Sequence, residues 1–184
     1  VLLSLAQGPD PELQREFNEQ VVASALSLGR KYRFDERHAR HVTRLALRLF
    51  DELQAEHGLD SFHRLLLRVA ALLHDIGVFI AATGHHKHGQ YLVASSEIFG
   101  LDRDDIAVIS NVVRYHRKSM PTPTHVSYVS LPRSRRIVVL KLAAILRVAD
   151  ALDRVSPPVA PAPAFNSEDA FVWNADAQGF EPVP

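Results

Sequence analysis

The sequence contains no cysteine, a single methionine and a single tryptophan, and its formal net charge is zero. Without cysteine, disulfide bonds and thiolate metal ligands are excluded, and the redox compartment is left open. Lysine plus arginine number 21 and aspartate plus glutamate also number 21, so no overall charge draws the chain to nucleic acid or to a membrane. We therefore expect no specific nucleic-acid binding, and any anion site must come from a local cluster of basic residues.

The sequence also lacks a hydrophobic run long enough to cross a membrane. Its start, VLLSLAQGPD, has too short an apolar run and no basic flank, so it predicts neither a signal peptide nor a membrane span. We accordingly expect a cytoplasmic protein. Because residue 1 is valine and not methionine, we also expect a fragment of a longer protein.

Hydrophobic residues make up 47% of the 184 positions, enough for one domain with a sizeable core. Their spacing of three and four residues predicts an all-α bundle of about six helices over residues 1–155. We expect these helices at 11–32, from Asp35 toward Gly58, and at about 61–81, 91–99, 102–115 and 132–154. Residues 156–184 are rich in proline and show no sustained period, which predicts an extended tail or the stump of a further module. No segment alternates long enough to predict a strand.

Two polar residues, His74 and Asp75, stand side by side in the apolar stretch VAALLHDIGVFI. Burying a carboxylate beside an imidazole is costly unless the pair is hydrogen-bonded, ion-paired or bound to a cation. The simplest interpretation is a core helix whose polar pair satisfies itself. A second interpretation arises because His38 lies at the edge of another apolar helix face, near the start of that helix.

Asp150 interrupts the apolar run of the last predicted helix. It lies on the same helical face as Arg147 and Arg154, so simple ion pairs at i, i+3 and i, i+4 would explain it. If the helices pack with their polar groups inward, however, Asp150 meets His38 and the His-Asp pair. Two imidazoles and two carboxylates are a natural site for a divalent first-row metal with open water positions.

Two further clusters are rich in histidine. The segment TGHHKHG, residues 83–89, is predicted to be a loop, and its histidines are poor core fillers; a solvated polar loop is the alternative. The segment RYHRK, residues 114–118, collects basic groups and His116 at a helix C-terminus, where cations are favoured. With Asp75 as a bridge, these histidines could hold a second metal, and metal pairs about 3.5–4 Å apart activate water against a phosphorus centre. Four basic side chains could neutralise phosphate oxygens: Lys87, Arg117, Lys118 and Arg147.

The order His, His-Asp, Asp on successive helices resembles the HD-domain superfamily of metal-dependent phosphohydrolases. More closely, five blocks resemble the C-terminal HD module of the exopolyphosphatase and guanosine pentaphosphate phosphatase family over residues 10–155. The blocks are HARHVTRLALRL (38–49), LLHDIGVFI (72–80), GHHKHGQYL (84–92), RYHRK (114–118) and LRVADALDR (146–154).

The resemblance implies roles for individual residues. It implies catalytic roles for His74 and Asp75 and phosphate contacts for His86 and His88. It also implies one or two divalent ions, which the ligand types do not narrow beyond Mn, Fe, Ni, Co, Zn or Mg. The metal ligands that it implies are His38, His74, Asp75, His85, His116 and Asp150.

Three functions stay open. The first is a metal-dependent phosphohydrolase acting on a nucleotide or a polyphosphate-like compound. The second is a non-catalytic accessory module that binds polyphosphate or a guanosine polyphosphate for a separate catalytic domain, because the family's exopolyphosphatase chemistry resembles that of actin-like N-terminal domains, which this sequence does not contain. The third is a structural helical domain used for dimerisation. The partners expected are therefore a phosphate compound or polyphosphate, an actin-like phosphatase domain and a second copy in a homodimer.

Overall fold

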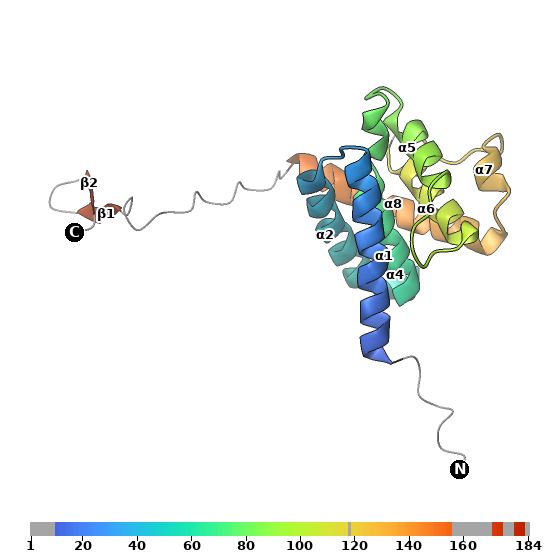
Figure 1. Cartoon of the computed structure of the whole chain (residues 1–184), viewed down its shortest axis with the longest axis horizontal. Helices are drawn as coiled ribbons and strands as arrows, with labels where there is room; N and C mark the ends of the chain where they lie inside the picture. Colours follow the sequence, from blue (N-terminus) through green and yellow to red (C-terminus); the bar gives the residue numbers. More distant parts are fainter. Residues whose placement is uncertain (1–9, 118, 156–170, 175–178, 183–184) are drawn as a thin grey trace, which may run out of the picture.

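The structure is a computed structural model that describes residues 10–117, 119–155, 171–174 and 179–182. Within these ranges the chain forms a bundle of α-helices, one 3₁₀ helix and a two-stranded ribbon (Figure 1). The elements are α1 (Pro11–Lys31), α2 (Glu36–Glu52), α3 (Gln54–His57), α4 (Ser61–Leu73), η1 (Ile76–Phe79), α5 (His85–Ala94), α6 (Arg103–Tyr115), α7 (Val126–Val129), α8 (Arg133–Val155), β1 (Phe171–Asn174) and β2 (Gly179–Pro182).

The predicted all-α fold is confirmed. Six of the described α-helices have ten residues or more, which agrees with the expected number, while α3 and α7 are single turns of four residues. The sequence pattern predicted no strand, and the structure adds two short ones, β1 and β2, which pair as an antiparallel ribbon with Phe171 in register with Pro182. Each strand has only four residues, too few for an alternating pattern to stand out. The proposed division of the chain after residue 155 stays a prediction.

Helix α4 forms the centre of the bundle. It contacts α1, α2, α6 and α8, and Figure 1 shows α1 and α2 lying beside it. From Leu65 to Leu73 all of its side chains but that of Arg68 are buried, so apolar residues surround almost its whole circumference. A helix that is apolar all round can only sit inside a protein, and that accounts for its central place. His74, which directly follows the last residue of α4, therefore lies in the interior.

The predicted helix starts at Asp35 and Asp102 are confirmed. The side chain of Asp35 accepts a hydrogen bond from the backbone N–H of His38 at 3.0 Å. Asp102 forms a capping box with Asp105, in which each side chain accepts from the other's backbone N–H. Such caps satisfy backbone donors that the helix itself leaves unpaired. The first cap fixes His38 in the first turn of α2.

The third predicted helix ends earlier than expected. Helix α4 stops at Leu73, and the chain continues into the 3₁₀ helix η1 instead of reaching residue 81. A Cβ atom at Gly77 would collide with the backbone oxygen of His85 and the backbone nitrogen of Gly89. The absence of a side chain at Gly77 therefore allows η1 to lie directly against α5.

The prediction of a loop at residues 83–89 was wrong, and the helix expected at 91–99 begins and ends earlier in the chain. Helix α5 begins at His85 and ends at Ala94, so the histidine cluster forms its first turn. The N-cap is Gly84, which has a φ of 75° and provides no capping side chain. Because the sequence has no Ser, Thr, Asp or Asn at the cap, the start of this helix carries none of the usual signals.

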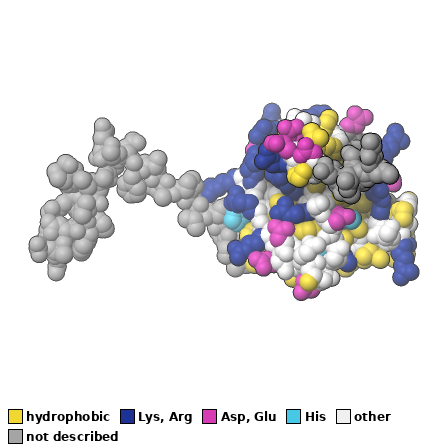
Figure 2. Space-filling view, turned by 90° about the horizontal axis from the view of Figure 1, so that it is seen from below, with side chains coloured by type: hydrophobic (Ala, Val, Ile, Leu, Met, Phe, Trp, Pro, Cys, Tyr) yellow, Lys and Arg dark blue, Asp and Glu magenta, His cyan; other side chains and the backbone are white. Residues whose placement is uncertain are grey.

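One face of the bundle carries side chains of both charges (Figure 2). Figure 2 shows Lys and Arg side chains mixed with Asp and Glu side chains on one face. No helix in the described ranges has the length and apolar character needed to span a bilayer. The apolar residues of α8 are not all buried, since Ile137, Leu140, Val148 and Leu152 are exposed while Leu142 and Leu146 pack in the core.

Candidate metal centre

Six side chains from six elements meet in the interior of the bundle. α2 contributes His38, and α8 contributes Asp150. His74 and Asp75 stand at the junction of α4 and η1, His85 is the first residue of α5, and His116 directly follows α6. The structure thus brings together all six residues that the sequence proposed as metal ligands, although it does not test that role.

Asp75 lies at the centre of the group. Its Oδ2 is 3.6 Å from Nε2 of His38 and 3.6 Å from Nε2 of His74. Its Oδ1 is 3.2 Å from Nε2 of His85 and 3.4 Å from Nε2 of His116. The ligand atoms therefore form two groups that share one carboxylate, which we call the first half (His38, His74, Asp75) and the second half (Asp75, His85, His116). A carboxylate with one oxygen in each group is suited to bridge two cations.

Asp150 belongs to the first half. Its Oδ1 is 4.0 Å from Nε2 of His38 and 3.9 Å from Nε2 of His74. Its Oδ2 accepts a hydrogen bond from Arg154 at 2.7 Å and lies 3.6 Å from Nε of Arg117. The ion pair expected between Asp150 and Arg154 is therefore present, and it uses one oxygen while the other oxygen faces the histidines.

All four inward-facing imidazoles are fixed by a bond from Nδ1. In His74, His85 and His116 this nitrogen donates to the carbonyl oxygen three residues earlier, over 2.6–2.8 Å. In His38 it donates to Oδ2 of Asp153 over 2.9 Å. Because a carbonyl or carboxylate oxygen accepts the Nδ1 proton, Nε2 of each neutral ring offers a lone pair to the centre. The rings are thus oriented as metal ligands are, with the second nitrogen held by an outer partner.

Within the part of the chain that the structure describes, three buried ligand atoms at the centre lack a partner of the kind that a cation would provide. Asp75 Oδ1, His85 Nε2 and His116 Nε2 are buried without a hydrogen-bond partner among the described residues. Such atoms cost free energy, which a cation between them would recover. In the first half, Nε2 of His38 and Nε2 of His74 are 3.1 Å apart. Two nitrogens bound to one ion at about 2.0–2.1 Å, at right angles, would be separated by about 3 Å. Both halves therefore fit a divalent metal.

The electrostatics of the centre favour an ionised carboxylate. Burial opposes ionisation of Asp75, but the imidazoles of His116 and His38 outweigh it and hold the pKa of this carboxyl well below its usual range. Conversely, Asp75, helped by Asp153 and opposed by burial, raises the pKa of His38 to about 9. Complete burial lowers the pKa of His74 to about 4, so this ring is neutral at pH 7. Without a cation, a proton on His38 balances part of the negative charge.

The residues predicted to contact phosphate come from α5, from the segment after α6 and from α8. Lys87 is exposed, and His86 and His88 are half-buried beside it in the first turn of α5. Burial, together with the adjacent His85, lowers the pKa of His86 to about 4, so His86 is uncharged at pH 7. The expected phosphate contact of Lys118 falls outside the described residues.

The two predicted arginine contacts come from elements other than α5. Arg117 faces Asp150, as described above, and Arg147 donates to Sδ of Met120 at 3.0 Å. Sequence reasoning missed Asp153 and Arg114. Asp153 stands three residues after Asp150, on the same face of the helix, which was the available signal. Arg114 donates to Oε1 of Gln90 at 3.0 Å, so it links α6 to α5 near the second half.

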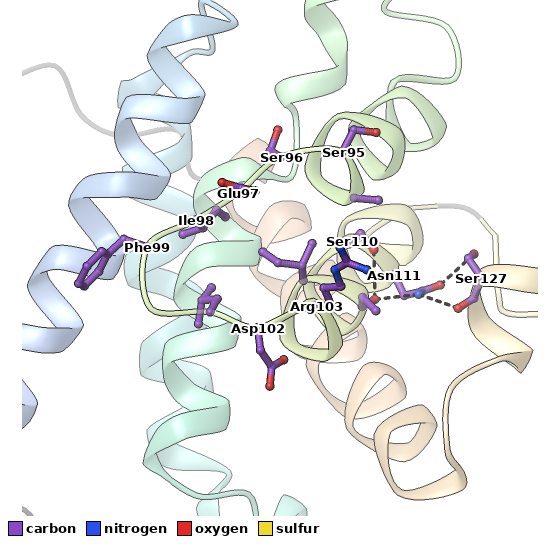
Figure 3. Close-up of a pocket in the computed structure, with 14 residues that line it drawn as sticks. Ser95, Ser96, Glu97, Ile98, Phe99, Asp102, Arg103, Ser110, Asn111 and Ser127 are labelled. Carbon is purple, nitrogen blue, oxygen red and sulfur yellow. Dashed lines mark hydrogen bonds between the residues drawn. The ribbon is translucent and has the colours of Figure 1, made fainter.

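A cavity of about 1020 Å³ lies at the other end of the α5–α6 pair (Figure 3). It is lined by the end of α5, the segment that follows, residues of α6 between 103 and 111, and Ser127. His85 and His116 lie at the opposite ends of these helices, and α5, with ten residues, is about 15 Å long. The cavity is therefore separate from the metal centre, and its lining includes none of the six candidate ligands.

Comparison with known proteins agrees with the proposed relationship. Residues 22–164 match the family described as Ppx/GppA phosphatase, domain III. The chain is 30% identical over 145 residues to a guanosine-5'-triphosphate,3'-diphosphate pyrophosphatase of Aliivibrio fischeri, a match that covers 77% of this chain and 28% of that protein. It is 32% identical over 124 residues to the protein of the same name from Pseudoalteromonas atlantica, covering 64% of this chain and 24% of the relative.

A third relative, from Pseudoalteromonas translucida, has the same name and is 31% identical over 91 residues, or 49% of this chain and 18% of that protein. The chain thus spans about a quarter of the length of the curated relatives that it matches. The family match covers well over half of the chain, including every residue of the candidate metal centre. This chain therefore belongs to the Ppx/GppA phosphatase family and corresponds to its domain III.

Proposed function

We propose that this chain is a divalent-metal-dependent phosphohydrolase module of the HD type, acting on a nucleotide or a polyphosphate-like compound. The observation that carries the proposal is the convergence of four imidazole Nε2 atoms, two on each oxygen of Asp75. The order His38, His74-Asp75, Asp150 along the chain supports the HD type. The name of the relatives suggests a guanosine polyphosphate as the substrate to test first.

The side chains suggest a division of labour. When bound, a pair of divalent ions would supply an activated water and polarise phosphoryl oxygens. Asp75 would hold the two halves at a fixed separation, and the neutral ring of His74 would serve as a ligand rather than as a proton donor. Lys87, Arg117, Lys118 and Arg147 would neutralise phosphate oxygens. His86 would donate a hydrogen bond without adding charge next to the ions, and His88 would donate a second hydrogen bond.

A second candidate function is an accessory module that binds polyphosphate or a guanosine polyphosphate for a separate catalytic domain. It is favoured by the short coverage of the relatives, because the activity in their name could reside in the remaining three quarters of their length. An actin-like phosphatase domain as partner, a homodimer and a cytoplasmic location remain predictions under either function. The presence of Asp75 and Asp150 argues for catalysis, since two carboxylates would repel a polyanion unless cations lie between them.

The test is phosphate release by the purified chain with manganese. Substrates should include guanosine 3',5'-polyphosphates, nucleoside triphosphates, short polyphosphates and simple phosphate esters. We expect release that chelator abolishes and that Asp75→Asn removes. Asp51→Asn is the matched control, because Asp51 is half-exposed and pairs with Arg64 on the bundle surface. Binding of polyphosphate with manganese but without turnover of any substrate would instead establish the accessory function.

A further inference from the structure

Asp153 lies directly behind the first half of the centre. It is 8% exposed, and its Oδ2 accepts a hydrogen bond from Nδ1 of His38 at 2.9 Å. The other three inward-facing rings donate to backbone carbonyls. Within the described part of the chain, His38 is therefore the candidate ligand whose outer partner is a charged side chain. The position of a backbone carbonyl is fixed by the helix, whereas a carboxylate side chain can be replaced by mutation.

Two further residues of α2, His41 and Arg44, extend the contacts of Asp153 toward the surface of the bundle. Nη2 of Arg44 is 3.0 Å from Nδ1 of His41. A guanidinium group can only donate, so Nδ1 of His41 accepts and the proton of the neutral ring sits on Nε2. This Nε2 faces Oδ1 of Asp153 at 3.6 Å, and Oδ1 is buried with no hydrogen-bond partner among the residues that the structure describes. His41 is thus oriented with its donor toward Asp153.

We propose that Asp153 is a positioning residue for the metal site: it holds His38 in the tautomer whose Nε2 can bind an ion, and His41 and Arg44 support it from behind. The inference rests on the metal centre of the proposed function. A carboxylate on the outer nitrogen also makes an imidazole a stronger electron donor to a metal. Removing such an outer partner typically lowers metal affinity by about 10- to 100-fold.

Asparagine is the informative replacement because it keeps the size of the side chain. If its carbonyl oxygen accepts from Nδ1, the charge is lost but the tautomer is kept. If its amide donates instead, the ring proton must move to Nε2, where it blocks the ion. Both arrangements weaken the first half. His41→Ala removes the support and leaves Asp153 in place, so we expect a smaller loss, of about threefold.

The experiment is a manganese titration of the whole chain by calorimetry at pH 8, comparing wild type, Asp153→Asn, His41→Ala and the control Asp51→Asn. We expect affinity for the ion in the first half to fall about 10- to 100-fold in Asp153→Asn, about threefold in His41→Ala and not at all in Asp51→Asn. In the zinc-loaded protein, the Nδ1–H resonance of His38 should shift in Asp153→Asn, while those of His74, His85 and His116 stay in place. A purely structural role would not move one ring selectively.

The outcomes separate this inference from the proposed function. Unchanged manganese affinity in Asp153→Asn with wild-type binding intact would overturn the positioning role alone. Loss of affinity without any phosphate release by the wild type would overturn the enzyme and support the positioning role. No manganese binding by the wild type would overturn both. If Asp153→Asn does not fold by circular dichroism, His41→Ala decides, and wild-type affinity in that variant would overturn the proposal.

Discussion

The two halves of the centre share Asp75 but are built from different parts of the fold. The first half rests on long helices, with His38 from α2, His74 after α4 and Asp150 from α8. The second half rests on η1, the first turn of α5 and the end of α6, where η1 and α5 touch through the bare backbone of Gly77. The first half is thus anchored in the core, and the second depends on the packing of two short elements.

The halves also differ in charge. The first half has a second carboxylate in contact, Asp150, and a third, Asp153, behind His38. The second half has Asp75 alone, and the cationic side chains of Lys87 and Arg114 lie close enough to disfavour protonation of His86 beside it. More negative charge favours a cation, and nearby positive charge favours an anion. Although Arg117 and Arg154 also contact Asp150 in the first half, this half has three carboxylates against one in the second half. Under the proposed function we therefore expect the first half to bind an ion more tightly, and the second half to bind one weakly and to face the phosphate.

The largest effect should come from the residue that both halves share. Asp75→Asn removes the charge that each half needs, so we expect both ions to be lost and phosphate release to fall to the level of the chelated wild type. The variant should keep the helical circular dichroism signal of the wild type, because the amide has the same size and sits outside α4. Metal content by mass spectrometry is the direct measurement. Retention of one tightly bound ion would show that the first half does not require the shared carboxylate.

Replacing one ligand at a time should separate the halves. His38→Ala is expected to abolish the tighter binding event in a manganese titration, and His116→Ala to abolish the weaker one, each leaving about one ion per chain. His63→Ala is the matched control, because His63 lies on the surface end of α4 and pairs with Asp60. Equal loss of both ions in the two variants would mean that the halves act as one site, and the contrast between them would be wrong.

Metal removal should lower the melting temperature of the protein, a smaller effect than the loss of an ion in the ligand variants. A ligand present at about 100 times its dissociation constant stabilises the folded state by about 2.7 kcal/mol. For a chain of this size that corresponds to a rise of about 5–10 °C in the melting temperature. We expect wild type to show this difference between manganese and chelator. His38→Ala should lose most of it and His116→Ala only part, because the tighter ion contributes more. Coincident melting curves for the wild type would favour a purely structural role of the histidines.

Sequence reasoning succeeded where a local signal decides the structure. The caps at Asp35 and Asp102 marked helix starts because a short carboxylate satisfies free backbone donors. The end of α4 could not be read, because the residues of η1 continue the same apolar pattern while their backbone tightens to a 3₁₀ turn. The uncapped start of α5 at Gly84 was missed for want of any side-chain signal.

The same distinction holds for the candidate centre. Its six proposed ligands were recognisable as polar interruptions of apolar helix faces, or from the resemblance, and the structure brings them together. The outer partner of His38, Asp153, was recognisable only as a second carboxylate on the helix face of Asp150. Asp150 and Asp153 lie on the same face of α8, and only the rotation of α8 against α2 decides which carboxylate faces Nε2 and which faces Nδ1. Helix rotation depends on packing across the whole bundle, which no local pattern records.

The smallest expected effect is the pH dependence of the tighter ion. In the metal-free protein Asp75 raises the pKa of His38 to about 9, so between pH 7 and 8.5 the ring holds a proton that an ion must displace. Apparent affinity should therefore rise about tenfold per pH unit over this window. His74 adds nothing to the slope, because its pKa of about 4 leaves it neutral throughout. The same proton stabilises the metal-free fold fully below pH 6.5, and this contribution is lost as the pH rises through 9. Chelated protein should thus melt at a lower temperature at pH 8.5 than at pH 6.5, while the stabilisation by manganese grows.

Titrations in buffers of different ionisation enthalpy should count about one proton released when the tighter ion binds at pH 7. If affinity for that ion were the same at pH 7 and pH 8.5, His38 could not be one of its ligands. The ligands of the first half would then have to include His74 and Asp150 without His38.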